Sequence, residues 1–141
     1  MKAIYLETSA VMDWLLEETT SQKIADVINN TETIITSVIT LIEAERTLIR
    51  AESTNRITAV KKNELRGLLS KAAADWNLMD LSSEVRARAS EPFPVEPVRA
   101  LDAIHLATAL EWAKVFFDIQ IFSRDKRILA NAKPLGIPTV S

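Results

Sequence analysis

Four acidic residues of this chain stand where carboxylates could gather around a divalent cation. Glu7 follows the apolar run KAIYL, and Asp125 comes shortly after the apolar run IQIF. Glu43 and Asp102 lie in two segments with a helical pattern, SVITLIEAERTLIR and RALDAIHLATALEWA. If the two apolar runs are neighbouring parallel strands, their carboxyl ends face one crevice, which is the usual ligand site of an open α/β sheet. Four like charges there would repel unless a cation offsets them, and oxygen ligands suit Mg²⁺ or Mn²⁺.

Each acid also has an ordinary structural explanation. Glu7 could cap the helix that follows it, although Glu is a poorer cap than Ser or Asp. Glu43 could pair with Arg46 or Arg50 along its own helix. Asp102 lies near a helix N-terminus, where the helix dipole stabilises an acid by roughly 0.3–1 kcal/mol. Each explanation is adequate alone, but four acids at equivalent ends of elements favour a shared site.

Short apolar runs alternate with helical patterns and predict the elements that would position these acids. Strands are expected at residues 2–6, 33–36, 77–81, 118–122 and 137–140. Helices are expected at 8–17, 22–30 with Ser21 as N-cap, 38–50 capped by Ser37, 56–76, 83–89 capped by Ser82 or Ser83, 99–114 and 126–133. This order predicts an α/β three-layer sandwich with a mainly parallel sheet.

The helical segments also predict which side chains face the core. The short turn at 53–55 predicts that the helices on either side of it form an antiparallel hairpin. The second of these helices should turn its apolar side chains inward, namely Val60, Leu65, Leu68, Leu69 and Ala72. The helix of Asp102 should pack on the sheet through Leu101, Ile104 and Thr108.

Length and composition exclude several classes of protein. The 141 residues predict one domain spanning 1–141. Cys is absent and His occurs once, which excludes thiolate and His-rich metal sites. With two glycines there is no glycine-rich phosphate loop. No apolar stretch is long enough for a membrane span, so we expect a soluble cytoplasmic protein.

Charge is unevenly distributed along the chain. Residues 1–45 hold eight acids and two bases, whereas residues 46–71 hold seven bases and two acids. An acidic pocket beside a basic arm is the distribution that a phosphodiester-cleaving site needs, with acids for metal ions and bases for the nucleic acid backbone. A solvated basic helix face is an equally good explanation of this block by itself.

The chain resembles the PIN-domain nucleases, and within them the VapC-type toxins. YLETSAVMDWL is similar to their first motif, and TSVITLIEAERTLIR to the second, which carries the Glu. LDAIHLATAL resembles a signature of the VapC branch and places the third acid at Asp102. IFSRDKRILANA is similar to the fourth motif and supplies Ser123 and Asp125. The four motifs occur in the expected order over residues 3–140.

The resemblance implies a fold, an activity and partners. It implies a parallel five-stranded sheet of order 3-2-1-4-5. It also implies a Mg²⁺- or Mn²⁺-dependent endoribonuclease that cuts structured RNA, often tRNA or ribosomal RNA. A cognate VapB-like antitoxin would block the site, and a homodimer is expected.

On this resemblance, the metal ligands and catalytic residues would be Glu7, Glu43, Asp102 and Asp125. Ser9 and Ser123 could orient water or phosphate, although a capping or turn role for either hydroxyl is equally good. The basic residues expected to bind the RNA backbone are Arg46, Arg50, Lys61 and Lys62. His105 is better explained as a hydrogen-bonded core histidine than as a general base, because a metal ion can itself activate water.

One residue departs from the family pattern. The first acid is normally Asp, and here it is Glu7, whose extra methylene moves the carboxylate by about 1.5 Å. A displaced water or a preference for Mn²⁺ could accommodate the longer side chain. The site could instead be attenuated or inactive, leaving a module that binds RNA or an antitoxin partner without cleavage. A receiver-like phosphoacceptor domain is a poorer alternative, because no lysine follows the last expected strand.

Overall fold

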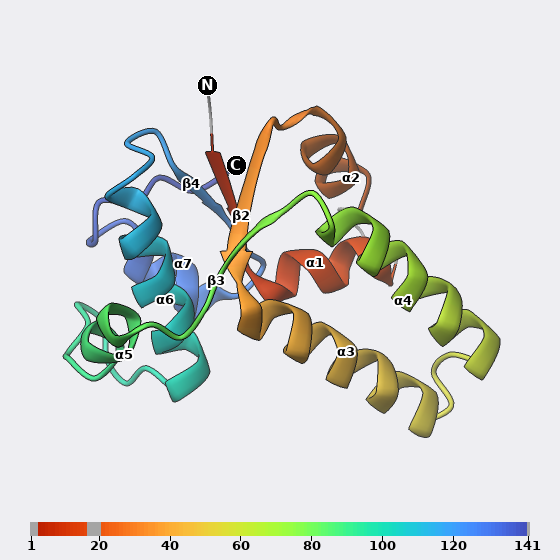
Figure 1. The fold of residues 1–141 in the computed structure, drawn as a ribbon. Coiled ribbons are helices and arrows are strands. Elements are labelled where there is room, and N and C mark those ends of the chain that lie inside the picture. Colours follow the sequence, from red (N-terminus) through yellow and green to blue (C-terminus); the bar gives the residue numbers. More distant parts are fainter. Residues whose placement is uncertain (1–2, 17–20, 141) are drawn as a thin grey trace.

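A parallel sheet lies between two layers of helices in the computed structural model, which describes residues 3–16 and 21–140 (Figure 1). The strands are β1 (Ala3–Leu6), β2 (Thr33–Ser37), β3 (Asn77–Met79) and β4 (Gln120–Phe122). Their order in the sheet is β3-β2-β1-β4, and every neighbouring pair is parallel. The parallel α/β sandwich predicted from the sequence is therefore confirmed in its layers.

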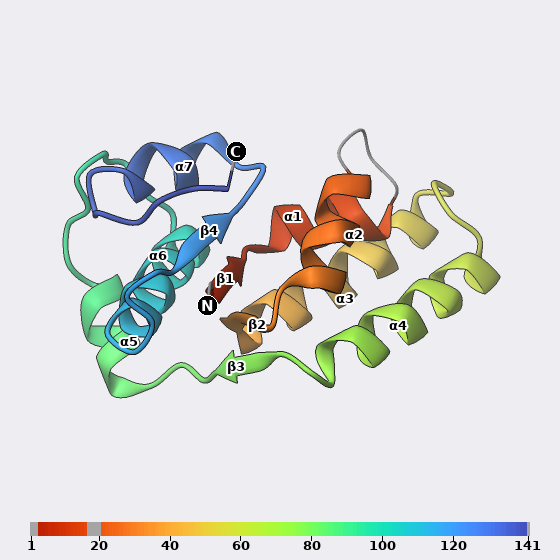
Figure 2. The ribbon, with the colours of Figure 1, turned by 90° about the horizontal axis from the view of Figure 1, so that it is seen from above.

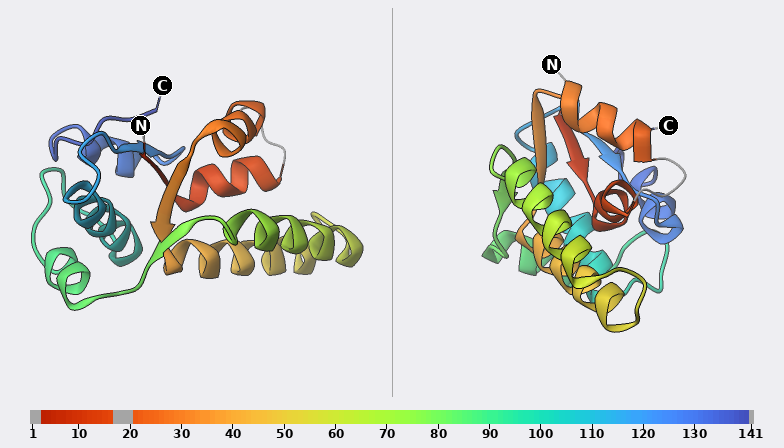
Figure 3. Two further views of the ribbon diagram at one scale, coloured as in Figure 1. Left: turned by 45° about the horizontal axis from the view of Figure 1, so that its top comes forward. Right: turned by 90° about the vertical axis from the view of Figure 1, so that its right-hand side faces the viewer.

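The helices divide between the two faces of the sheet. On one side lie α1 (Thr8–Leu15), α2 (Ser21–Asn30), α3 (Val38–Ser53) and α4 (Ala59–Ala73). On the other side lie α5 (Ser83–Ala89), α6 (Ala100–Ala113) and α7 (Lys126–Ala132). Figure 2 shows the two groups on opposite sides of the strands. In Figure 3, α3 and α4 extend beyond the sheet as the predicted antiparallel pair.

Strand β1 contributes to both halves of the core. Successive side chains of a strand point to opposite faces. Ile4 and Leu6 therefore pack with α1–α4, while Ala3 and Tyr5 pack with α6 and α7. Glu7 continues the series of Ala3 and Tyr5, so the backbone directs its side chain toward the layer that carries Asp102.

The chain reverses direction across the sheet at β1. It passes from β1 to β2 and β3 on one side, and then returns to place β4 on the other side of β1. In open α/β sheets, the carboxyl ends of the strands at such a switch point form the ligand crevice. Residues that follow β1 and β4 consequently meet at one place.

Helix starts follow the predicted caps. The Ser37 hydroxyl accepts a hydrogen bond from the Ile39 N–H (3.1 Å), and Ser82 accepts from the Val85 N–H (3.2 Å). These bonds satisfy N–H groups that have no partner within the helix. The side chain of Ser21, also predicted as a cap, lies outside the described part of the structure.

The fifth predicted strand at 137–140 is replaced by a single parallel bridge. This bridge joins Thr139 to Ile121 on the open side of β4, with hydrogen bonds from Ile121 N–H to Pro138 O (2.9 Å) and from Val140 N–H to Ile121 O (3.0 Å). Because proline lacks an N–H, it cannot donate to a regular ladder. The structure thus has four strands in its described residues.

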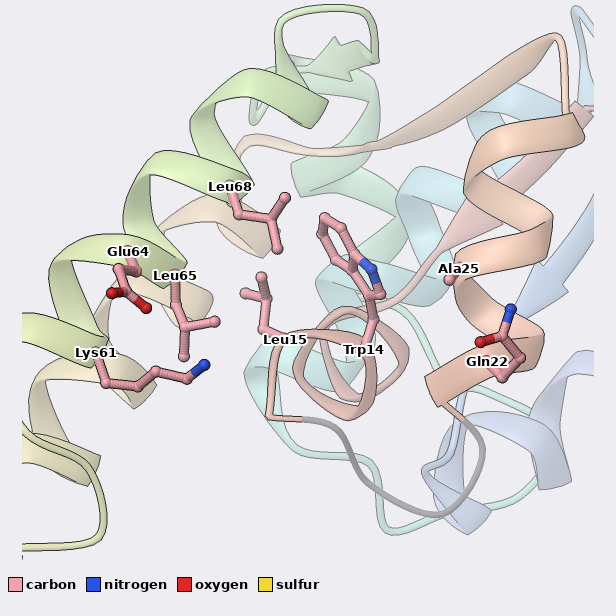
Figure 4. Close-up of a pocket in the computed structure, with 8 residues that line it drawn as sticks. All are labelled: Trp14, Leu15, Gln22, Ala25, Lys61, Glu64, Leu65 and Leu68. Atoms are coloured by element: carbon pink, nitrogen blue, oxygen red, sulfur yellow. The ribbon is translucent and has the colours of Figure 1, made fainter.

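Two predictions of inward-facing side chains are wrong. Val60 on α4 is 69% exposed, and Leu101 on α6 is 46% exposed. Leu68 does face inward, toward Trp14 of α1, but it is 45% exposed because it lines an open hollow (Figure 4). Val60 and Leu101 lie in the first turns of their helices, and α4 belongs to the pair that projects beyond the sheet, where only one helix face finds a partner (Figure 3). Helix α4 also ends at Ala73 rather than near Trp76.

No helix among the described residues has both the length and the apolar character that a membrane span requires.

Candidate active site

Glu7 stands at the junction of β1, β4 and α1. Its N–H donates to Phe122 O (3.0 Å), and its buried side chain forms the N-cap of α1. One carboxylate oxygen, Oε1, accepts from the hydroxyls of Ser9 (2.5 Å) and Ser123 (2.6 Å). The other, Oε2, accepts from the Ser9 N–H (3.1 Å). The two predicted serines therefore hold Glu7, and its capping role coexists with its place in the crevice.

Asp125 lies close enough to Asp102 for its charge to act on that side chain. Asp125 caps α7 by accepting from the Arg127 N–H (2.9 Å), and its own N–H donates to the Ser123 hydroxyl (2.9 Å). Partial burial raises the pKa of Asp102, and the nearby charges of Asp125 and Glu7 raise it further. Asp102 thus lies close enough to Glu7 and Asp125 for their charges to oppose its ionisation.

Glu43 is held by two polar side chains from other elements. Its Oε1 accepts from the Thr8 hydroxyl of α1 (2.6 Å) and lies 2.6 Å from Nε2 of His105 on α6. Burial opposes ionisation of Glu43, but these hydrogen bonds outweigh it and lower the pKa of the carboxyl. Neither Arg46 nor Arg50, both described, forms an ion pair with Glu43. Glu43 is therefore kept charged at the edge of the crevice.

His105 connects Glu43 to a buried tyrosine. Its Nδ1 lies 2.8 Å from the Tyr5 hydroxyl. Burial raises the pKa of Tyr5 well above its ordinary value, with the charge of Glu7 adding to the effect, so the phenol is protonated and donates to Nδ1. An ionised carboxylate can only accept, which assigns the histidine proton to Nε2. His105 is thus a buried, hydrogen-bonded histidine that positions a predicted metal ligand.

The four acids form two sets rather than one ring. The charges of Glu7 and Asp125 act on Asp102, whereas Glu43 is bound to Thr8 and His105. Within residues 3–16 and 21–140, no three Asp, Glu or His side chains are arranged to hold a metal ion as they stand. The donors are nevertheless carboxylate oxygens that repel one another, and a divalent cation would relieve that repulsion. The chemistry of this set fits Mg²⁺ or Mn²⁺.

The predicted RNA-binding residues occupy different places. Arg46 and Arg50 are exposed and follow Glu43 by three and seven positions, so they lie on its side of α3. Lys62 forms an ion pair with Glu52. Lys61 lines a separate hollow of about 480 Å³ between α1, α2 and α4 (Figure 4), and none of the four predicted acids belongs to the lining of that hollow.

Three residues near the acids were not predicted to belong to the site. The Thr8 hydroxyl donates to Glu43, and the Tyr5 hydroxyl is hydrogen-bonded to His105. The backbone N–H of Arg124 donates to the Ser9 hydroxyl (2.7 Å). A sequence signal exists for two of them: Thr8 directly follows Glu7, and Arg124 stands between Ser123 and Asp125. For Tyr5, the only signal is a phenol in an otherwise aliphatic buried strand.

Asp102→Asn should stabilise the metal-free protein at neutral pH. The folded-state pKa of Asp102 is raised, so the wild type loses stability as pH rises through that pKa, whereas Asn carries no charge. The gain should be below about 1 kcal/mol because the side chain is partly exposed. Urea unfolding in EDTA measures it, near pH 7 and again well below the ordinary carboxyl pKa of 3.8, where Asp102 is protonated in both states and the difference should vanish. A less stable variant at neutral pH would contradict the proposed repulsion.

The sequence of the chain is similar to a known protein family and to a characterised relative. A family model described as PIN domain matches residues 4–134. Ribonuclease VapC35 of Mycobacterium tuberculosis is 31% identical over 140 residues, covering 98% of this chain and 96% of that protein.

Two solved structures share the fold. FitAcB from Neisseria gonorrhoeae matches with a TM-score of 0.72 at 17% identity, over 98% of this chain and 96% of that chain. VapBC2 from Rickettsia felis, bound to a DNA fragment from its promoter, matches with a TM-score of 0.65 at 13% identity, over 98% and 97% of the two chains. At these identities the structures establish the likeness of the fold alone.

Proposed function

This chain belongs to the PIN domain family, and from that premise we propose that it is a divalent-metal-dependent endoribonuclease acting as the toxin of a toxin–antitoxin pair. The observation that supports the proposal is that Glu7, directly after β1, and Asp125, shortly after β4, both bond to the Ser123 hydroxyl, and that the charges of both acids act on Asp102. The relative named as a ribonuclease covers nearly the whole chain, which supports treating residues 1–141 as one PIN domain.

The catalytic residues of the proposal are the four acids. Glu7, Asp102, Asp125 and Glu43 would hold one or two Mg²⁺ or Mn²⁺ ions. A bound cation would polarise the scissile phosphate and lower the pKa of a water molecule. Thr8 and His105 keep Glu43 ionised and in one orientation, while Ser9 and Ser123 do the same for Glu7.

The substrate and partners of the proposal follow from the charges and the relatives. Structured RNA, such as tRNA or ribosomal RNA, would meet the exposed arginines of α3 beside the acids. A further solved structure that shares the fold is a toxin–antitoxin complex from Klebsiella pneumoniae, which supports a VapB-like antitoxin as partner, and a homodimer is part of the same proposal.

Cleavage of a panel of total tRNA and ribosomal RNA in EDTA, Mg²⁺ and Mn²⁺ tests this function. We expect cutting that requires the divalent ion and is absent in EDTA. Binding of RNA without any cutting under all three conditions would favour the second candidate, a PIN module that binds RNA or an antitoxin without efficient cleavage. The observation that favours this candidate is that Ser9 and Ser123 already engage both oxygens of Glu7.

Glu7→Asp separates the two candidates. Asp caps helices better than Glu, so the variant should fold, while its carboxylate withdraws by about 1.5 Å from the serine hydroxyls. If the wild type is an active enzyme, the variant should cut the same RNA at a rate within about tenfold, because one carboxylate remains in the crevice. The same panel, with rates taken at saturating Mn²⁺, measures this. A silent wild type beside an active Glu7→Asp variant would show that the longer side chain disables the site.

A further inference from the structure

A pocket of about 370 Å³ lies next to the acids and is not used in the function proposed above. One wall is a single face of α1, built from Ser9, Met12, Asp13 and Leu16 at spacings of three and four residues. Ser9 connects the pocket to the crevice, because its hydroxyl donates to the Glu7 carboxylate (2.5 Å). The volume falls in the range of small-ligand sites, roughly 300–1,000 Å³.

Two arginines line the same pocket. Arg124 enters from the loop between Ser123 and Asp125, is about half exposed, and has its Nε 3.5 Å from Oδ2 of the buried Asp13. Arg56 enters from the turn after α3. A guanidinium has five N–H donors in a planar fork suited to phosphate.

The remaining lining complements the arginines. Met12 and Leu16 offer apolar surface for a base or sugar, and Thr47 lies one helical turn after Glu43. Cationic groups for a phosphate next to an apolar face for a base are the two contacts that a nucleotide requires. A purely apolar groove would suit a peptide helix better, but this pocket combines charge with direct continuity to the acids.

We propose that this pocket binds the ribonucleotide adjacent to the scissile phosphate, with Arg124 and Arg56 on its phosphate and Met12 against its base. The inference rests on the proposed function, since it takes RNA as the substrate. It adds a binding site on α1, α3 and the β4–α7 loop that neither the four acids nor the basic residues of α3 and α4 supply.

Nuclear magnetic resonance titration of the full chain tests the proposal without requiring cleavage. A mixed-sequence hexaribonucleotide is added in EDTA, and amide shifts are followed. Saturable shifts should centre on Met12, Thr47 and Arg124. Arg124→Met and Arg56→Met should each weaken binding by about five- to tenfold, as expected for loss of a charge-assisted hydrogen bond at a partly exposed site. Lys114→Met is the matched control, because it removes one exposed charge at the far end of α6 and should change affinity less than about twofold.

Three results would overturn the proposal. These are shifts that avoid the pocket, equal losses in Lys114→Met and Arg124→Met, or identical shifts with hexaglutamate, which would make the pocket a general anion site. The outcome is independent of the nuclease. A protein that binds the oligonucleotide here but never cuts RNA would contradict the nuclease and support the pocket. A protein that cuts RNA but shows no shifts at the pocket would support the nuclease and contradict the pocket.

Discussion

Asp102→Asn is expected to lower divalent-metal-dependent RNA cleavage by roughly 10²–10³-fold or more, the cost of removing one preorganised electrostatic group from a catalytic site. The charges of Glu7 and Asp125 act on Asp102, so the amide would remove the charge of a proposed metal ligand without changing side-chain size. Initial cleavage rates at saturating Mn²⁺ measure the loss. Because the same change should stabilise the metal-free protein, lost activity would not be attributable to unfolding.

Two controls sharpen this expectation. Asp118→Asn removes an exposed acid from the loop before β4, at the opposite end of the strand from Asp125, and should leave cleavage unchanged. Mn²⁺ should raise the Tm of the wild type more than that of Asp102→Asn, because a ligand that binds the folded state stabilises it by mass action. Full activity in Asp102→Asn would remove this residue from the site, and equal Mn²⁺ stabilisation of both proteins would remove it from the metal ligands.

His105→Leu should destabilise the protein by about 2–4 kcal/mol, because it leaves the Tyr5 hydroxyl and the Glu43 carboxylate without their shared partner in a largely buried setting. Leu has a similar volume, so a packing defect contributes little. Tyr5→Phe removes one hydroxyl and should cost about 1–2 kcal/mol. Urea unfolding of the three proteins near pH 7 gives both differences.

The pH dependence of this loss has a definite sign. The folded-state pKa of Glu43 is lowered from 4.5, so its ionised form contributes stability above that value, and the contribution is lost as pH falls through the folded-state pKa. The difference between the wild type and His105→Leu should therefore shrink in acid. A difference that stays constant, or a variant as stable as the wild type at neutral pH, would show that His105 only fills space.

Local sequence patterns predicted most of the fold because they act over short distances. The uninterrupted apolar run Ala3–Leu6 predicts a strand buried on both faces, and the core contains its side chains in that arrangement. Ser37 and Ser82 mark helix starts because a hydroxyl next to free N–H groups needs no distant partner. The exposure of Val60 could not be predicted in this way, since it depends on how far α4 projects beyond its neighbours.

The sequence alone determined which residues could form the site: Glu7 and Asp125 at strand ends, Asp102 near a helix start, and serines beside two of them. Tertiary structure alone decided their partners. His105 contacts Glu43 across 62 positions and Tyr5 across 100, and the Arg124–Asp13 pair joins a loop to α1. The physical reason is the different distance along the chain over which each effect acts. Propensity and periodicity act within a few residues, whereas a hydrogen bond between α3 and α6 depends on how the whole sheet packs its two helical layers.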